Sequence, residues 1–250
     1  MTHVTLNGVK IHCLTMDAAV CAGLELLEED STHWCFTPNP KLLTLAARDE
    51  GLRDILNRAH LSLADGVGVV LAARLTGQRR ISRCPGADYA LALAQAAGAR
   101  HKRIFLLGGT PGVAEAAGER LLAQCPGLIL AGALDGFSSD LSLAAEKIRA
   151  ANADLVFVCL GCPRQEKWIA RYGGETGARL LLGLGGTLDV LAGRVRRAPV
   201  RWQRLGLEWL WRGLCQPRRL TEWWRLPLFL FQALHEPKEE DACGRKIDRP

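Results

Sequence analysis

The chain alternates short apolar runs of about five residues with longer stretches whose apolar positions recur at helical spacing. The short runs are partly β-branched, which is typical of buried parallel strands. We predict strands at His33–Thr37, Leu61–Ala64, Arg103–Leu107, Leu128–Ala131, Leu155–Leu160 and Leu180–Leu184. The stretches between them predict helices at Asp17–Glu29, Gly66–Thr76, Ala87–Ala97, Pro111–Gln124, Leu141–Ala151 and Pro163–Tyr172.

This alternation predicts an α/β fold with a Rossmann-like, doubly wound and mainly parallel sheet. The alternation stops after Gly193, where we expect a helical C-terminal appendage to begin. The predicted domains are 1–193 for the Rossmann-like domain, which should carry the chemistry, and 194–235 for the appendage. The polar stretch 236–250 is expected to be a disordered tail.

Positive charge is concentrated in the appendage. The chain has a net charge of +6, but Arg194–Arg225 holds nine arginines against two glutamates, so the other residues sum to about −1. Five of the seven tryptophans lie in the same segment. Arginine pairs with phosphates and Trp prefers the membrane interface, so we expect contact with an anionic membrane surface. The alternative is a helix that docks on the domain, with its Trp side chains in the core and its Arg side chains in water. The segment contains no known DNA- or RNA-binding module, so we expect no nucleic-acid partner.

Cysteine usage and hydropathy bear on location. The nine cysteines are odd in number and irregularly spaced, and the first 30 residues lack a secretory signal, so we expect a reduced, cytoplasmic protein. No run reaches the ~18 apolar residues of a membrane-spanning helix, which predicts a peripheral location. Cys159 and Cys162 form a single C-x-x-C, for which packing at a strand end is a better explanation than zinc. We expect no metal and no cofactor.

Glycines and polar residues follow the predicted strands, where open parallel sheets bind ligands. Asp65 comes directly after one strand and before a glycine-rich helix start, so it could be a helix cap or a general base. Gly108-Gly109 and Gly185-Gly186 open helices and could admit a phosphate, or could serve only as tight turns. Taken together the loops favour a nucleotide ligand, while the absence of a following Lys-Ser or Lys-Thr argues against a Walker-type hydrolase.

Short motifs occur in a fixed order from Val4 to about Phe231. They are Thr37-Pro38-Asn39-Pro40, Ala64–Gly68, Arg83 with Pro85–Asp88, Phe105–Gly109, Gly161–Glu166, Gly183–Asp189, Arg196–Pro199, Glu208–Arg212 and Gln216–Arg219. This series resembles the WecG/TagA/CpsF glycosyltransferases, glycosyltransferase family 26. The resemblance implies an inverting, metal-independent transfer of a sugar from a UDP-sugar to a polyprenyl-diphosphate-linked N-acetylglucosamine. N-acetylmannosamine is the expected sugar, and another UDP-hexose or a uronic acid is the alternative.

The family places this reaction at the cytoplasmic membrane face, in the synthesis of teichoic acid or another cell-surface polysaccharide. By resemblance, Asp65 is the base that activates the acceptor hydroxyl, and Thr37, Asn39 and Gln165 contact sugar. Arg212 and Arg219 of the appendage are expected to close over the diphosphate. The remaining predicted substrate-binding residues are Arg83, Gly108, Gly109, Gly185, Gly186 and Asp189. One departure is Glu222, which stands where family members often carry a further basic residue.

Two other functions remain open from the residues alone. The pattern Gly108-Gly109-x-x-Gly112, with Asp135 beyond the next strand, suggests an NAD-dependent oxidoreductase, although the spacing is not G-x-G-x-x-G. A membrane-surface scaffold that uses only the appendage is the non-catalytic alternative. An apolar, Arg-rich appendage could also be buried between subunits, so a homo-oligomer is left open.

Overall fold

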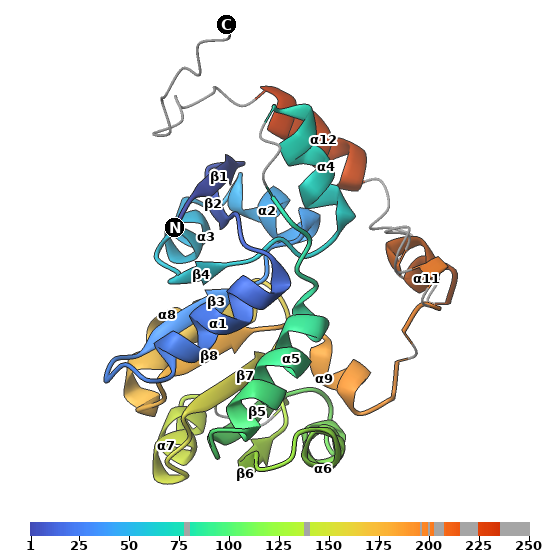
Figure 1. Ribbon diagram of the computed structural model, residues 1–250. Helices are drawn as coiled ribbons and strands as arrows, with labels where there is room; N and C mark the ends of the chain where they lie inside the picture. Colours follow the sequence, from blue (N-terminus) through green and yellow to red (C-terminus); the bar gives the residue numbers. More distant parts are fainter. Residues whose placement is uncertain are drawn as a thin grey trace, which may run out of the picture.

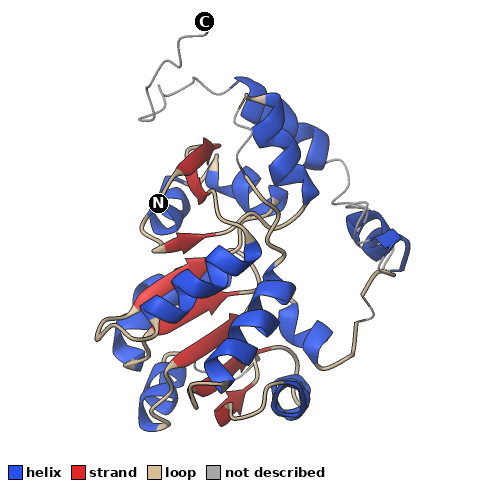
Figure 2. Cartoon of the chain, in the orientation of Figure 1, coloured by secondary structure: helices blue, strands red, loops and turns tan. Residues whose placement is uncertain are grey.

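A six-stranded parallel sheet forms the centre of the molecule, in the order β4-β3-β8-β7-β5-β6 (Figures 1 and 2). This computed structural model describes residues 1–77, 81–137, 141–195, 197–199, 201–202, 208–215 and 225–235. The strands are β3 (His33–Phe36), β4 (Leu61–Ser62), β5 (Arg103–Gly108), β6 (Ile129–Leu134), β7 (Leu155–Cys159) and β8 (Leu180–Gly183). The predicted α/β, Rossmann-like architecture is confirmed.

The central strands are apolar because helices cover both faces of the sheet. All five residues of β7 are buried, whereas the edge strand β6 is half-exposed along most of its length. The apolar run predicted β6 at 128–131, but the strand continues to Leu134. The extension consists of Gly132, Ala133 and Leu134, and glycine and alanine are depleted in strands, so the local sequence favours an earlier end.

Helices pack in two layers and enclose two hydrophobic clusters, one on each side of the sheet. The helices that match predictions are α1 (Met16–Leu26), α4 (Val67–Leu75), α5 (Gly86–Gly98), α6 (Val113–Gln124), α7 (Leu143–Ala150) and α8 (Arg164–Tyr172). The sequence analysis missed α2 (Pro40–Ala46), α3 (Glu50–Asn57), the 3-10 helix η1 (Gly173–Thr176) and α9 (Thr187–Leu191). Each missed helix is at most eight residues long, which is too short for a clear apolar period.

The sequence analysis also missed an N-terminal hairpin. Strands β1 (His3–Leu6) and β2 (Val9–His12) pair antiparallel around Asn7-Gly8. Both turn residues have positive φ, 52° and 71°, as a tight hairpin turn requires. An Asn-Gly pair flanked by alternating apolar residues is a sequence pattern that predicts such a hairpin turn.

The described part of the C-terminal segment contains two helices, α11 (Glu208–Cys215) and α12 (Arg225–His235). Helix α12 packs against α2 and α4, and its Phe229 and Ala233 are 0% and 4% exposed (Figure 1). The apolar face of α12 therefore belongs to the main hydrophobic core. No helix among these ranges has both the length and the apolar character for crossing a bilayer. The predicted disordered tail, 236–250, lies outside the described residues.

Candidate functional site

A cavity of about 470 Å³ lies at the carboxyl ends of four strands. It is lined by the loops that follow β3, β4, β7 and β8, with further walls from Arg83–Ala87 and from Val195, Arg197 and Glu208. The volume falls in the usual range for a small-molecule site. The polar and glycine-rich loops that follow the strands therefore gather at one end of the sheet, as predicted, and they enclose a cavity.

Asp65 lies in the wall of this cavity, half-buried, between β4 and α4. Its backbone N–H donates to Pro38 O at 2.9 Å, which ties the loop after β4 to the loop after β3. The N-cap of α4 is Gly66, with φ 103°, so Asp65 is not the N-cap residue of this helix. Its carboxylate also contributes, after burial, to raising the pKa of the Cys84 thiol to about 11.

Thr37 and Asn39 reach the cavity from the loop after β3. The Thr37 hydroxyl donates to Gly183 O at 3.3 Å, which fixes it against β8. Asn39 is the N-cap of α2, and its Oδ1 accepts from Leu42 N at 3.0 Å. The cap uses the carbonyl end of Asn39, so the amide nitrogen is the end left to act as a donor toward a ligand.

Gln165 lies in the first turn of α8 and bridges two loops of the cavity. Its Oε1 accepts from Gly185 N at 2.8 Å, and its Nε2 donates to Glu166 Oε1 at 2.8 Å. Gly183 makes room for this amide, because an added Cβ there would lie 3.2 Å from Gln165 Nε2 and 2.8 Å from the Phe36 ring. Gln165 is 4% exposed and Glu166 is 0% exposed.

Two arginines bring positive charge to the cavity, and each is paired with a carboxylate. Arg197 forms a two-pronged ion pair with Asp88 of α5, one contact of which is Nη2 to Oδ2 at 3.1 Å. Glu208, at the start of α11, lies 3.6 Å from Arg83 Nη2 and 3.8 Å from Arg197 Nη2. The Asp88 carboxylate is the main cause of the raised pKa of Arg197, so this guanidinium stays charged.

The two predicted glycine loops have different roles. Gly185 and Gly186 line the cavity, as does Asp189. Gly108 and Gly109 are not among the described lining residues. Gly108 has φ 133°, and a Cβ there would lie 2.3 Å from Cys159 O, so its missing side chain is needed for the close approach of β5 to β7.

The diphosphate-binding roles of Arg212 and Arg219 in the appendage remain predictions. Arg212 lies in α11, but its side chain is outside the described part of the structure, and Arg219 falls in the range 216–224, also outside it. Glu222 lies in the same range.

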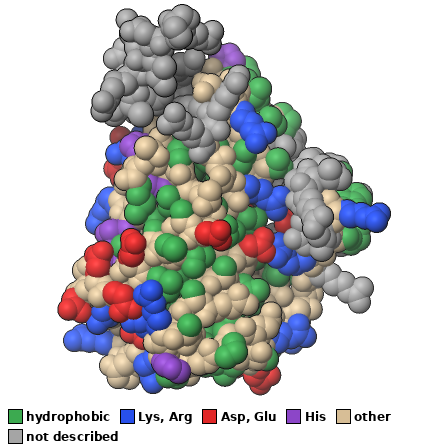
Figure 3. Space-filling view, in the orientation of Figure 1, with side chains coloured by type: hydrophobic (Ala, Val, Ile, Leu, Met, Phe, Trp, Pro, Cys, Tyr) green, Lys and Arg blue, Asp and Glu red, His purple; other side chains and the backbone are tan. Residues whose placement is uncertain are grey.

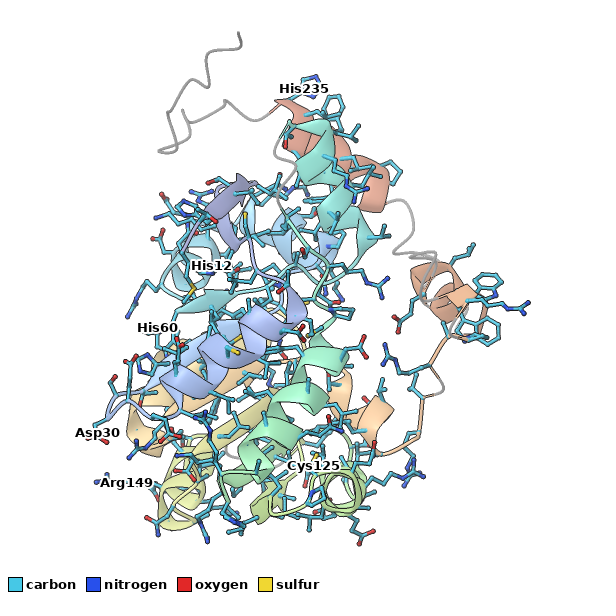
Figure 4. All side chains as sticks on the ribbon, viewed as in Figure 1. His12, Asp30, His60, Cys125, Arg149 and His235 are labelled. Atoms are coloured by element: carbon cyan, nitrogen blue, oxygen red, sulfur yellow. The ribbon has the colours of Figure 1, made fainter. Side chains whose placement is uncertain are left out.

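Within the described residues, no group of three or more His, Cys, Asp or Glu side chains has the arrangement of a metal site. Cys159 is buried in β7, and burial raises the pKa of its thiol to about 12, which agrees with the packing role predicted for it. Figure 4 shows three of the histidines, His12, His60 and His235, spread along the molecule.

Sequence reasoning assigned no role to three residues that line the cavity, namely Glu166, Arg197 and Glu208. All three lie inside the motifs on which the family resemblance rests, so their position in those motifs could have identified them as candidates. The contacts of Arg197 and Glu208 come from distant segments; Arg197 and its partner Asp88, for example, are separated by 109 positions. Such pairings are visible only in the folded chain.

Comparison with known proteins assigns the chain to a family. Residues 4–242 match the model of the glycosyl transferase WecG/TagA/CpsF family. An N-acetylglucosaminyldiphosphoundecaprenol N-acetyl-beta-D-mannosaminyltransferase of Bacillus subtilis (strain 168) is 37% identical over 85% of this chain and 83% of its own length. Proteins of the same name are 35% identical in Bacillus spizizenii, over 88% and 84%, and 28% identical in Staphylococcus aureus (strain MRSA252), over 90% and 92%. The chain therefore belongs to the WecG/TagA/CpsF family and is a glycosyltransferase.

Proposed function

We propose that this protein transfers an N-acetyl-β-D-mannosaminyl group from a UDP-linked donor to N-acetylglucosaminyl-diphosphoundecaprenol. Family membership and the names of the Bacillus and Staphylococcus relatives support the transferred sugar and the acceptor. The observation that carries the proposal is Asp65, an acidic residue that lies in the wall of the cavity. Product synthesis would supply a precursor for a cell-surface polymer such as teichoic acid.

Asp65 acts as the general base in this proposal. It takes the proton of the acceptor hydroxyl while that oxygen attacks the anomeric carbon of the donor. The bond between that carbon and the UDP oxygen breaks with its electron pair leaving on UDP. A single displacement of this kind inverts the anomeric configuration. Thr37, Asn39 and Gln165 lie in the same walls and would orient the sugars.

Guanidinium groups are proposed to stabilise the charge that develops on UDP, without a divalent ion. Arg83 and Arg197 already line the cavity. The described lining holds three basic side chains, Lys41, Arg83 and Arg197, against four acidic ones, Asp65, Glu166, Asp189 and Glu208. This part of the cavity therefore has no excess of positive charge for a diphosphate, which supports the expectation that Arg212 and Arg219 complete the site.

We also infer that the protein binds the inner membrane face peripherally, because the acceptor is a lipid. Apolar side chains lie on the surface over α4 and α12 (Figure 3). Leu71, Leu75, Phe231 and Leu234 there are 41%, 53%, 60% and 51% exposed. The Arg-rich segment immediately precedes α12 in the sequence, so basic and apolar groups would reach an anionic bilayer together.

The other functions weighed from the sequence lose support. The oxidoreductase rested on the Gly108 loop, which packs against β7 and is not in the described cavity lining, and the family assignment takes its place. A different UDP-hexose or uronic acid donor remains the alternative within the family.

A donor panel tests the proposal. UDP release is measured from several UDP-sugars, with and without a short-chain lipid-diphosphate N-acetylglucosamine. We expect acceptor-dependent release from UDP-N-acetylmannosamine and product of inverted configuration by NMR. Release from a different donor alone would replace the donor assignment, and no acceptor-dependent release from any donor would contradict the proposed reaction.

A further inference from the structure

A carboxyl group with no solvent exposure lies directly beside the proposed sugar-binding amide. Glu166 occupies the first turn of α8, contributes to the cavity wall and is 0% exposed. Unpaired glutamates are seldom buried to this extent, because desolvation disfavours the charged form. Burial here raises the pKa of Glu166 to about 7. The proposed mechanism assigns it no step.

The two oxygens of Glu166 have different surroundings. Oε1 accepts the hydrogen bond from Gln165 Nε2 at 2.8 Å. Oε2 is buried and has no hydrogen-bond partner among the described residues. Since the side chain is inaccessible to solvent, it cannot touch a sugar directly. Any effect on the reaction must pass through its one side-chain partner, Gln165.

The Gln165 amide is held at both ends, and this determines which way round it lies. Its oxygen accepts from Gly185 N at 2.8 Å, while its nitrogen donates to Glu166. A flipped amide would place NH₂ against the Gly185 N–H and a carbonyl oxygen against the Glu166 oxygen, so both hydrogen bonds would be lost. In the observed orientation, one N–H of Nε2 is used by Glu166 and the second remains for the cavity.

We propose that Glu166 is a positioning residue for sugar transfer: its Oε1 fixes the Gln165 amide so that one N–H faces the sugar and the loop after β8 stays docked. The inference rests on the proposed function. Either protonation state retains an accepting oxygen, so the role needs an acceptor at this position and not a negative charge.

A structural explanation competes with this proposal, because an acid in the first turn of a helix is favourable by itself. Glu146 in the first turn of α7 is exposed and provides a matched control. If Glu166 only supported the helix start, Glu146→Leu and Glu166→Leu should have comparable effects on stability and on kcat/KM.

The test is a double-mutant cycle with Gln165. Glu166→Leu keeps the volume and removes the acceptor, whereas Glu166→Gln keeps an accepting oxygen. We expect Glu166→Leu to lower kcat/KM by about tenfold or more, with near-normal unfolding temperature, because small displacements of a positioning group are costly. Glu166→Gln should restore most of the activity. In a Gln165→Ala background, adding Glu166→Leu should lower kcat/KM almost no further.

A second readout does not depend on activity. The side-chain NH₂ of Gln165 is observed by ¹⁵N NMR, assigned by its loss in Gln165→Ala. We expect its two protons to be well separated in chemical shift in wild type and in Glu166→Gln, and to converge in Glu166→Leu. An unchanged Gln165 signal, or an equal loss of activity in both backgrounds, would overturn the proposal. If wild type released no UDP from any donor, the proposed function would fail while the NMR result would still decide the positioning role.

Discussion

Asp65 stands one residue before the N-cap of α4, and that single position decides how its carboxylate can be used. Had the helix begun at Gly66, Asp65 would be the N-cap residue. Gly66 takes the cap position instead, with a positive φ of 103°. Asp65 then precedes the cap and lies in the cavity wall.

We predict that Asp65→Asn lowers turnover by about two orders of magnitude or more, the usual scale for losing a general base. UDP binding should be nearly unchanged, because the amide keeps the size of the carboxylate. The measurements are acceptor-dependent UDP release and calorimetric titration with UDP. Asp54→Asn, an exposed aspartate of α3, is the matched control. Wild-type turnover in Asp65→Asn would remove this residue from the mechanism.

Glu166 also makes a prediction about stability and pH. Its pKa is raised by burial from 4.5 to about 7, so between these values the folded chain keeps a proton that the unfolded chain has lost. The contribution of Glu166 to stability is therefore expected to fall as pH rises through this window, by about 3 kcal/mol at most. Glu166→Gln, which has no proton to lose, should gain stability relative to wild type from about pH 5 to about pH 8. Urea unfolding at both pH values measures this, and parallel pH profiles for the two proteins would contradict it.

At the scale of elements, α12 is assigned to the appendage by composition but is packed as part of the core. Its residues contact α2 and α4, and Asn7 Nδ2 of the hairpin turn donates to Gln232 Oε1 at 3.4 Å. Helix α12 therefore has two apolar faces. One carries Phe229 into the core, and the other leaves Phe231 and Leu234 exposed.

Substituting one phenylalanine on each face of α12 tests this arrangement. Phe229→Ala should destabilise the protein by about 3–5 kcal/mol, because it leaves a cavity in the core. Phe231→Ala, at a position that is 60% exposed, should change stability by less than about 0.5 kcal/mol. Chemical denaturation of both variants checks the prediction. Equal effects would show that α12 is not docked as described.

At the scale of the whole molecule, a lipid acceptor requires the cavity and a membrane-binding surface to work together. Helix α12 and the pair α6 and β6 lie at opposite ends of the molecule (Figure 1). Exposed apolar side chains on α6 and β6 can therefore serve as a control for those on α12. Deleting residues 194–250 would be a poor test, because it also removes Phe229 from the core.

Replacing Phe231 and Leu234 by Ser should weaken binding to anionic vesicles about tenfold or more, since each exposed side chain that enters the bilayer contributes about 1.5 kcal/mol or more. The control is Leu122→Ser with Ile129→Ser, two positions that are each 40% exposed on α6 and β6. Vesicle co-sedimentation measures binding, and UDP release from the donor in the presence of a water-soluble acceptor should be unchanged. Equal losses in both double variants would argue against a membrane surface at α12.

The sequence alone determined the parallel sheet, because six apolar runs at regular spacing have few other ways to be buried. It also placed Thr37, Asn39, Asp65, Gln165 and Gly185 at one rim, since parallel strands carry their following loops to the same edge. Short helices such as α2 and α9 escaped detection because their stability comes from tertiary contacts and not from a local period.

Only the tertiary structure decided which similar motifs share the cavity. Both glycine loops follow a strand, but Gly185 lines the cavity whereas Gly108 serves the contact between β5 and β7. The difference lies in which strands become neighbours, and a local motif does not encode that order. The pairing of Arg197 with Asp88 and the bracing of Gln165 between Gly185 and Glu166 have the same origin. The contacts of Arg197 with Asp88 and of Gln165 with Gly185 join separate segments, so their geometry exists only when the sheet has brought its loops together.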